Sequence, residues 1–248
     1  MLGYFRRVNE KLNRLFFAEY SEYQRRYQSL ICPRVRGARV TLDLGAGRRD
    51  VRHFWELEGQ AIDTKGVLIA VDLDVERLGM NPNGLKVAAD GCSLPFRGSS
   101  IDLIVTLSMM EHLERPAAVL AEVGRVLKRG GAMVFATPQR FSYISIVAAM
   151  TPLRFHHWFY RMHLDAGNES DCCQTLYRLN TVRDIRRCAH GANLVLAECT
   201  GHVGGPCYTL SLPPPLHFLF VLFHKLVEQS EFTRRSFGVN LVGVLEKP

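Results

Sequence analysis

The chain has 248 residues, of which 47% are hydrophobic and 22% are charged, and its formal net charge is +7. This composition excludes a disordered chain, and the length is enough to bury one full α/β core. The positive charge permits anionic partners such as nucleic acid, phospholipid or acidic metabolites, but it requires none of them.

The seven cysteines argue against a disulfide framework or a zinc ribbon, because they are odd in number and irregular in spacing. We therefore expect reduced thiols in a cytoplasmic protein, and we assign no role to the adjacent Cys172 and Cys173. The N-terminus does not read as a signal peptide, since Glu10, Lys11 and Arg14 interrupt any apolar stretch. The apolar run "LHFLFVLF" at 216–223 is well short of the ~18 residues of a spanning helix.

Residues 4–28 predict one amphipathic helix, because aromatic and aliphatic side chains recur at helical spacing with arginines between them. We interpret it as a helix packed on the edge of the domain, in preference to a membrane or nucleic-acid contact. Residues 216–227 are likewise interpreted as an ordinary core helix. The alternative is that this helix and the basic N-terminal helix rest together on an anionic membrane surface.

The middle of the chain alternates predicted strands with predicted helices. The strands are "RVTLDL" (39–44), "GVLIAVDLD" (66–74), "LKVAAD" (85–90), "IDLIVTLS" (101–108) and "AMVFATP" (132–138). Helices are predicted over 48–58 and from Pro116 to about Lys128, with Pro at the start and glycines past the end. This alternation predicts a parallel sheet with helices on both faces.

After Pro138 the alternation breaks, and residues 139–180 are rich in aromatics and histidines. We predict that they form a cap over the carboxyl edge of the sheet, where α/β folds bind ligands. A helix at 181–190, a strand near 193–199 and a last strand in "FGVNLVGVLEKP" complete the sheet. The predicted division is a helical extension (1–37), a ligand-binding core (38–138), the cap (139–180) and a C-terminal completion (181–248).

The ends of four predicted strands carry glycines or polar residues, and these ends meet at one edge of a parallel sheet. Gly45 and Gly47 follow the first strand in the G-x-G spacing, but Asp50 stands where a dinucleotide fingerprint has its third glycine. Asp72 ends the second strand, where it can accept hydrogen bonds from ribose hydroxyls. Asp90 follows the third strand, and "SMMEHLERP" follows the fourth.

With these residues in place, the chain resembles the class I S-adenosylmethionine-dependent methyltransferases of the type 11 group. The resemblance lies in "LDLGAG" with Asp72 downstream, and in "AADGCSLPFRGSSIDLIVTLSMMEHLERPAAVLAEVGRVLKRGGAMVFATP". It is strong over 38–138, weaker in "LYRLNTVRDIRRCAHGANLVLAE" and "VGVLEKP", and it does not extend to 1–37 or 139–176. It implies an α/β, Rossmann-like sheet of seven mostly parallel strands, S-adenosylmethionine as cofactor and S-adenosylhomocysteine as product.

The resemblance also implies residue roles toward S-adenosylmethionine. Asp43 organises the glycine turn, Asp72 binds the ribose, and Asp90 binds the adenine amine. The turn Gly45–Ala46–Gly47 lies against the methionine part, and the Leu107 carbonyl receives the ammonium group. Leu73 flanks the adenine, and Gly91 or Cys92 supplies backbone beside the ring. S-adenosylmethionine has no pyrophosphate to seat at a helix start, so a third glycine is not needed. Because Asp72 follows Asp43 by 29 residues rather than the typical ~20, Asp74 is an alternative ribose ligand.

Catalytic residues are expected just after the fourth strand, beside the acceptor. His112 is our first candidate for a base or acceptor-orienting group, with Glu111 beside it. The pair resembles the E-x-x-E-H metal site of some quinone and small-RNA methyltransferases, but Ser108 replaces the first glutamate, so we predict no metal. His156, His157 and His163 are further candidates to line an acceptor pocket in the cap.

We expect the methyl acceptor to be a small molecule or a lipid-like compound, because the predicted cap is aromatic and compact. Alternatives are an RNA or protein methyltransferase, or a protein that binds S-adenosylmethionine without transferring its methyl group. Nucleic acid is not indicated, since no RNA-binding module is recognisable, yet it stays open as a partner. An oxidoreductase is disfavoured by Asp50. Peripheral membrane contact is a further possibility, and the sequence predicts no oligomeric state.

Overall fold

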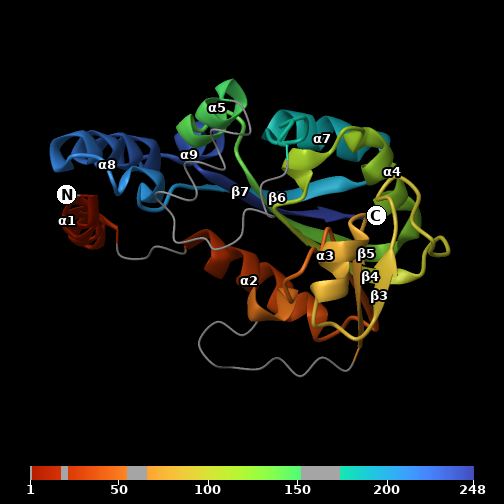
Figure 1. Cartoon of the computed structure of the whole chain (residues 1–248). Helices are drawn as coiled ribbons and strands as arrows, with labels where there is room; N and C mark the ends of the chain where they lie inside the picture. Colours follow the sequence, from red (N-terminus) through yellow and green to blue (C-terminus); the bar gives the residue numbers. More distant parts are fainter. Residues whose placement is uncertain (1, 18–21, 55–65, 152–173) are drawn as a thin grey trace.

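A seven-stranded sheet forms the centre of the computed structural model, which describes residues 2–17, 22–54, 66–151 and 174–248 (Figure 1). The strand order is β3-β2-β1-β4-β5-β7-β6. All pairings from β3 to β5 are parallel, while β7 is antiparallel to both β5 and β6. The expected mostly parallel α/β sheet is confirmed. Its strands are β1 Val40–Leu44, β2 Val67–Asp72, β3 Lys86–Ala88, β4 Ile101–Leu107, β5 Leu127–Pro138, β6 Val195–His202 and β7 Asn240–Glu246.

The helices begin where the local sequence supplies caps. Pro116 occupies the first turn of α4, and the Thr181 and Ser230 side chains accept backbone N–H groups at the starts of α7 and α9. Short 3-10 turns cover Val51–Phe54, Met110–His112 and Cys207–Thr209. The α-helices are α1 Leu2–Phe16, α2 Glu22–Val35, α3 Val75–Met80, α4 Pro116–Val126, α5 Tyr143–Met150, α7 Val182–Gly191, α8 Pro214–Glu228 and α9 Glu231–Phe237.

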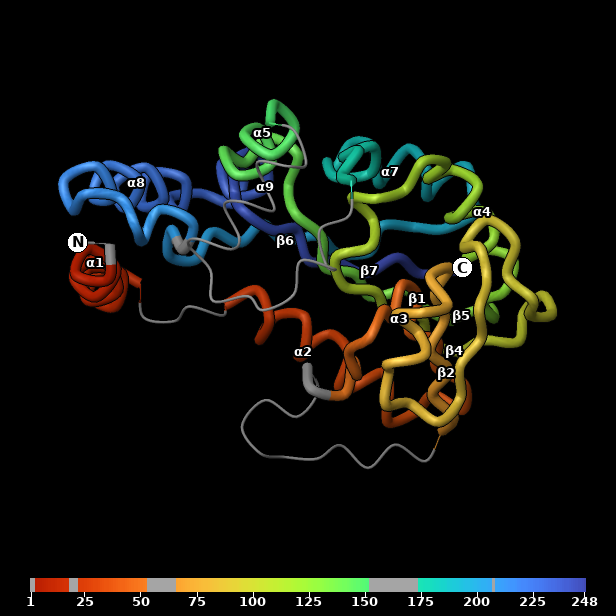
Figure 2. Tube along the Cα trace, viewed as in Figure 1, coloured from red at the N-terminus to blue at the C-terminus, as the bar shows by residue number. Residues whose placement is uncertain are grey.

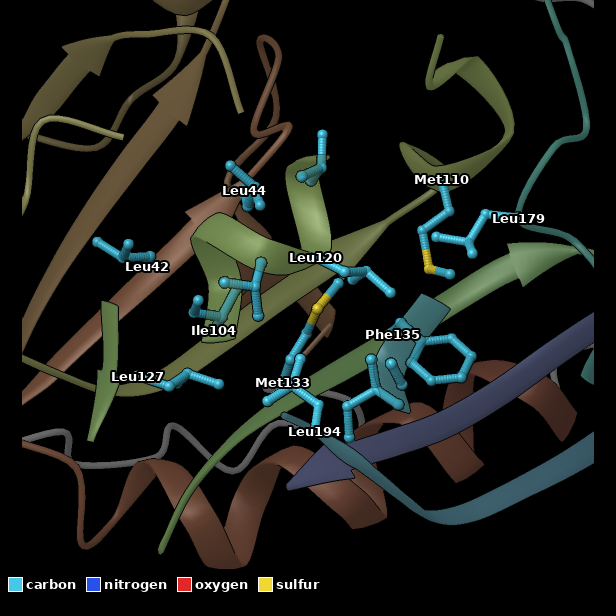
Figure 3. Packing of buried hydrophobic residues seen from close by; sticks show 14 of the residues in the cluster. Leu42, Leu44, Ile104, Met110, Leu120, Leu127, Met133, Phe135, Leu179 and Leu194 are labelled. Atoms are coloured by element: carbon cyan, nitrogen blue, oxygen red, sulfur yellow. The ribbon is translucent and has the colours of Figure 1, made fainter. Parts of the chain in front are cut away.

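Helices cover both faces of the sheet, because alternate residues of each strand point to opposite sides. On one face Ile104, Met133 and Phe135 pack with residues of α4 and α7 (Figure 3). On the other face Val105 and Val134 pack against α2. In Figure 2, α2 lies below the sheet and α7 above it, while α1 and α8 lie together beyond one end.

Strand order reverses beside β1, which has β2 on one side and β4 on the other. The register pairs Leu44 with Val71 and Asp43 with Val105, so β1, β2 and β4 end at one level. A crevice at such a reversal is where open α/β sheets bind ligands. The fold therefore brings the ends of the predicted strands to a single site.

Three predicted helices differ from the structure. The single helix expected over 4–28 is wrong, because α1 ends at Phe16 and α2 begins anew at Glu22 and continues to Val35. The two helices have different partners, since α1 packs on α8 and α2 packs on the sheet. Of the helix expected over 48–58, the described part is only the turn Val51–Phe54, and α4 ends at Val126 because Leu127 already pairs with Ile101.

Helix α8 is a core helix on one face only. His217, Val221, His224 and Val227 are buried, whereas Leu219 and Leu226 are 59% and 66% exposed. Within the described ranges, no helix is long and apolar enough to cross a membrane. Most of the predicted cap falls at 152–173, outside the described residues, and so do His156, His157, His163, Cys172 and Cys173.

Candidate cofactor and catalytic site

A cavity of about 1580 Å³ opens at the carboxyl ends of β1, β2 and β4. Every residue predicted to bind the cofactor lines it, and so do both predicted catalytic residues. These residues are Asp43, Gly45, Ala46, Gly47, Asp72, Leu73, Asp90, Gly91, Leu107, Glu111 and His112.

The glycine turn after β1 needs its glycines for two different reasons. Gly45 has φ +78°, and a Cβ there would lie 2.5 Å from the Met109 Cγ, so a larger residue clashes. Gly47 has φ +51° with open space around it. The Gly45 N–H donates to the Val71 carbonyl at 2.8 Å, which ties the turn to the end of β2. Backbone is thus exposed to the cavity at this turn.

Asp72, at the last position of β2, holds the same turn from the other side. Its carboxylate accepts the Gly47 N–H at 2.7 Å and the Asp74 N–H at 2.8 Å. A carboxylate has about four lone-pair sites, so acceptor capacity is left for two hydroxyls. Asp74 instead caps α3 by accepting the Arg77 N–H at 3.0 Å. Both carboxylates line the cavity, but Asp72 ties β2 to the glycine turn whereas Asp74 caps α3.

Asn81, which the sequence analysis missed, holds the glycine turn by hydrogen bonds to its backbone carbonyls. Its buried Nδ2 donates to the carbonyls of Gly47 at 3.1 Å and Arg49 at 2.8 Å, and more weakly to that of Ala46. Its Oδ1 accepts the Asn83 N–H. A lone asparagine just after a helix carries no sequence signal for such a role, because its partners lie more than thirty residues away.

We expect an Asn81→Ala variant to lose about 1–3 kcal/mol in its free energy of unfolding, because the carbonyls of the turn lose the buried amide that donates to them. Chemical denaturation measures this loss. The change should also weaken cofactor binding, since the turn is no longer held. Exposed Asn193→Ala, which starts from a residue at positive φ outside the cavity, is the control for cofactor affinity and should leave it unchanged. An Asn81→Ala protein as stable as wild type would contradict this account of the turn.

Asp43 is an acid in a low-dielectric setting beneath the turn. It is 5% exposed, and burial, followed by the nearby Asp50 and Asp72 carboxylates, raises its pKa well above the ordinary value. Asp50 pairs with Arg52, accepting both its N–H at 2.9 Å and its guanidinium. Asp50, which stands where a dinucleotide fingerprint has its third glycine, thus directly precedes the short turn Val51–Phe54. Asp43 favours a cation beside it, because a cation stabilises its ionised form.

Asp90 stands at the far side of the cavity, two residues beyond β3. Its Oδ1 accepts the Cys92 N–H at 2.8 Å, and Arg115 lies 3.4 Å from its Oδ2. Gly91 lies against Val119, where a Cβ would come within 3.5 Å. Leu73, 71% exposed, stands at the entrance from β2. This part of the cavity wall thus combines the apolar Leu73 and Val119 with the Asp90 carboxylate and its Arg115 partner.

Glu111 and His112 belong to a hydrogen-bonded chain that reaches β5. The buried Glu111 Oε2 accepts the Thr137 hydroxyl at 3.1 Å, and Thr137 Oγ1 in turn accepts Asn180 Nδ2 at 2.6 Å. His112 Nδ1 lies 2.8 Å from the Gln174 carbonyl, and its Nε2 lies 3.9 Å from Glu111 Oε1. Burial raises the pKa of Glu111, while the neighbouring imidazole opposes that rise. Thr137 and Asn180 gave no signal in the sequence, because they meet Glu111 only in the fold.

Ser108 takes the place of the first glutamate in the E-x-x-E-H pattern, at φ +54° and on the wall of the cavity. Throughout the part of the chain that the structure describes, no three His, Cys, Asp or Glu side chains gather as metal ligands would. The set at this position offers one carboxylate and one imidazole. It is better suited to proton transfer than to holding an ion.

The start of α2 also lines the cavity, which the sequence analysis did not foresee. Glu22, Tyr23 and Gln24 face it, and Glu22 lies 3.7 Å from His202 of β6. One turn further, the fully buried Tyr27 lies near Asp43. The N-terminal region therefore closes the cavity beside the glycine turn.

The end of the cavity away from β2 is mainly apolar. Tyr143 and Val147 of α5 line it together with Leu212 and Phe220, and the Tyr143 and Phe220 rings lie 5.1 Å apart. Ligand sites commonly occupy about 300–1,000 Å³. A volume of about 1580 Å³ thus leaves space for a second, apolar ligand beside the first.

Residues 42–135 match a family model described as a methyltransferase domain. A ubiquinone biosynthesis O-methyltransferase of Nitrosococcus oceani is 32% identical over 124 residues, covering 48% of this chain and 49% of that protein. A probable S-adenosylmethionine-dependent methyltransferase of Mycolicibacterium smegmatis is 31% identical over 112 residues, covering 45% of this chain and 40% of that protein. The match thus spans half or less of the length of these curated relatives.

A solved structure extends the likeness beyond this stretch. The S-adenosylmethionine-dependent methyltransferase from Archaeoglobus fulgidus has a TM-score of 0.56 at 16% identity, and the match covers 92% of this chain and 95% of that one. At this identity the likeness shows a shared fold. The two findings agree: residues 42–135 match a methyltransferase domain, and the chain shares its α/β fold with an S-adenosylmethionine-dependent methyltransferase.

Proposed function

We propose that this protein transfers a methyl group from S-adenosylmethionine to an oxygen or nitrogen of a small-molecule or lipid-like acceptor. The observation that carries the proposal is that one continuous cavity joins the glycine turn, Asp72 and Asp90 to His112 and to its apolar end at Tyr143 and Phe220. One part fits a nucleoside with a cationic tail and no phosphates. The other part fits an apolar acceptor.

In the proposed binding mode, Asp72 accepts the ribose hydroxyls and Asp90 accepts the adenine amine between Leu73 and Gly91. The Gly45–Ala46–Gly47 turn and the Leu107 carbonyl hold the methionine part, with Asp43 supplying negative charge. Two features of the structure support this fit. The lack of a Cβ at Gly45 leaves the backbone accessible, and Asp72 retains acceptor capacity.

S-adenosylmethionine supplies an electrophilic methyl group on a sulfonium. The residues of the chain align the acceptor, exclude water and take its proton. His112 Nδ1 must donate to the Gln174 carbonyl, because a carbonyl only accepts. In the neutral ring Nε2 therefore carries the free lone pair, and it accepts the acceptor's proton.

Glu111 stabilises the imidazolium that results. Its Oε1 lies 3.9 Å from His112 Nε2, while the Thr137 hydroxyl holds Oε2. Because Glu111 is buried, its attraction to a charged imidazole is stronger than in water. Thr137 and Asn180 act as positioning residues, since neither reaches the acceptor and both fix the carboxylate that does the stabilising.

The buried Asp43 makes stability depend on pH. Its pKa is raised by folding, so its contribution to stability is complete below the unfolded value of about 3.9 and is lost as pH rises through the folded value. An Asp43→Asn variant has no such loss. We expect its free energy of unfolding, relative to wild type, to increase between about pH 4 and pH 8. Denaturant unfolding across this range measures the difference, and a constant difference would show that Asp43 stays ionised throughout.

Two measurements test the proposed function. Calorimetric titration should show binding of S-adenosylmethionine and S-adenosylhomocysteine, and binding of NAD alone would overturn the proposal. Methyl-labelled S-adenosylmethionine is then incubated with cell extract that is afterwards split into lipid, small-molecule, nucleic-acid and protein fractions. Label in the first two fractions supports the proposed acceptor. Label in RNA or protein favours that alternative, and cofactor binding without any labelled product identifies a binding protein without transfer activity.

A further inference from the structure

The start of α2 places a carboxylate in the cavity beside the end of β6. Glu22 lines the cavity with 55% of its side chain exposed, and its Oε1 lies 3.7 Å from His202 Nδ1. β6 lies three strands away from β4, so at the usual spacing about 14 Å separates the ends of these two strands. Glu22 therefore stands on the β6 side of the cavity, whereas His112 follows β4.

His202 supports this carboxylate from behind. The imidazole is 7% exposed, and its buried Nδ1 has no hydrogen-bond partner within the described part of the chain. Its Nε2 lies 2.9 Å from the Thr200 hydroxyl, whose contact with the Val242 carbonyl is longer at 3.4 Å. When the hydroxyl donates to Nε2, the neutral ring carries its proton on Nδ1, which faces Glu22. The imidazole lowers the pKa of Glu22 against the opposing effect of burial, so the carboxylate is ionised at neutral pH.

The charge of Glu22 stands alone on its side of the cavity. Among the lining residues that the structure describes, every other aspartate, glutamate and arginine lies between Asp43 and Arg115 in the sequence, around the proposed cofactor site, and no lysine lines the cavity. Arg234 of α9 acts on Glu22 from outside the lining, but its guanidinium is paired with Glu231 at 2.8 Å. The cavity thus offers one anionic group to whatever fills its β6 side.

An acceptor that fills the apolar part of the cavity removes water from this carboxylate. A carboxylate that loses water without gaining a partner is costly, so a wholly apolar acceptor is disfavoured here. An ammonium group facing Glu22 replaces the lost water with a charge-assisted hydrogen bond. A hydroxyl supplies a weaker hydrogen bond, and a second carboxylate is repelled.

We propose that Glu22 is a specificity residue, which selects an acceptor that carries a protonated amine on an apolar body, remote from the atom that is methylated. The inference rests on the proposed function, which puts the methylated atom near His112, and it narrows the acceptor to apolar amines. His202 is a positioning residue, because its buried Nδ1 faces the carboxylate and is closed to the acceptor.

The test is calorimetric titration of the full chain, saturated with S-adenosylhomocysteine, with octylamine, octanol and octanoate. These probes share one chain and differ in the head group. We expect wild type to bind octylamine at least about threefold more tightly than octanol, as for a partly exposed charge pair, and to bind octanoate most weakly. Glu22→Gln keeps the side-chain shape without the charge, so it should bind octylamine and octanol alike. His202→Leu should lower the ratio of these two affinities, a readout that a loss of stability alone does not move.

Glu114→Gln is the matched control, because Glu114 is an exposed carboxylate of the same cavity that follows β4. It should keep the preference for octylamine. The proposal is overturned if wild type has no such preference, or if the control loses it equally. Weaker binding of S-adenosylhomocysteine by Glu22→Gln would also overturn it, because the carboxylate would then belong to the cofactor.

Labelled cell extract separates this inference from the proposed function. Transfer of labelled methyl to a compound that a cation exchanger retains at neutral pH supports both. Labelled products that the exchanger does not retain overturn the amine and leave the methyl transfer in place. Absence of any labelled product overturns the proposed function alone, because the preference for octylamine is measured without transfer.

Discussion

A His112→Ala variant is expected to lose about 10²–10⁴-fold in the rate of methyl transfer, the usual contribution of a positioned base. Its affinity for S-adenosylmethionine should stay close to that of wild type, because the predicted cofactor contacts lie on other residues. The rate is measured in a single-turnover experiment, in which labelled methyl is transferred to the fraction of the cell extract that accepts the label. A variant that keeps full transfer activity would show that His112 is a structural residue.

Thr137→Val provides the accompanying test of positioning. It removes the hydroxyl that Glu111 Oε2 accepts while keeping the side-chain shape, and Asn180 keeps its bond to the Pro138 carbonyl at 2.8 Å. Loss of this donor raises the pKa of Glu111 further, because the ionised form loses a hydrogen bond. We expect the acidic limb of the pH–rate profile to move to higher pH. A profile unchanged in shape would mean that Thr137 contributes only packing.

Asp72→Ala is expected to weaken S-adenosylmethionine binding by well over about tenfold, which corresponds to more than about 1.4 kcal/mol. In the proposed binding mode the carboxylate accepts two ribose hydroxyls. In the structure it also accepts the Gly47 and Asp74 N–H groups, so the variant loses the order of the glycine turn as well. Calorimetric titration measures the affinity, and thermal unfolding without ligand measures the loss of order.

Asp74→Ala is the matched control, because Asp74 lines the same cavity two residues later and caps α3. Removing the cap should cost about 1 kcal/mol of stability and leave the affinity within about threefold of wild type. If instead Asp74→Ala abolishes binding and Asp72→Ala does not, the ribose contact belongs to Asp74. The pair of variants thus decides between the two carboxylates that the sequence left open.

The central strands were predictable because burial on both faces leaves a local signal. β1, β2 and β4 are runs rich in aliphatic residues; β1 is followed by Gly45, β2 ends at Asp72 and β4 is followed by Ser108, and their ends define the site. Asp43, Asp72 and Asp90 could therefore be placed before the fold was known. The boundary between α4 and β5 was not predictable to the residue, since Leu127 suits either element and its pairing with Ile101 decides.

The remaining features depend on contacts between distant residues. The helical spacing over 4–28 continues across two helices, because both are amphipathic, and only their separate partners divide them. Asn81, Thr137 and Asn180 are ordinary polar residues until the fold brings them to the glycine turn or to Glu111. The apolar pattern of α8 predicted a helix correctly but not its buried face, which carries two histidines and two valines, since an almost wholly apolar run has no polar side to mark the solvent.

The position of α2 has a consequence for how the chain is made. Helix α2 packs on β5 and β7, and Arg34 pairs with Glu246, which is 212 residues further along. Asn9 likewise depends on the carbonyl of Leu210. During synthesis the first helices emerge long before β7, so the contacts of α2 with β4 and β5 can form before its contacts with β7. We therefore expect a chain stalled before β7 to lack the Arg34–Glu246 pair and the Asn9–Leu210 bond that join the two ends of the sequence.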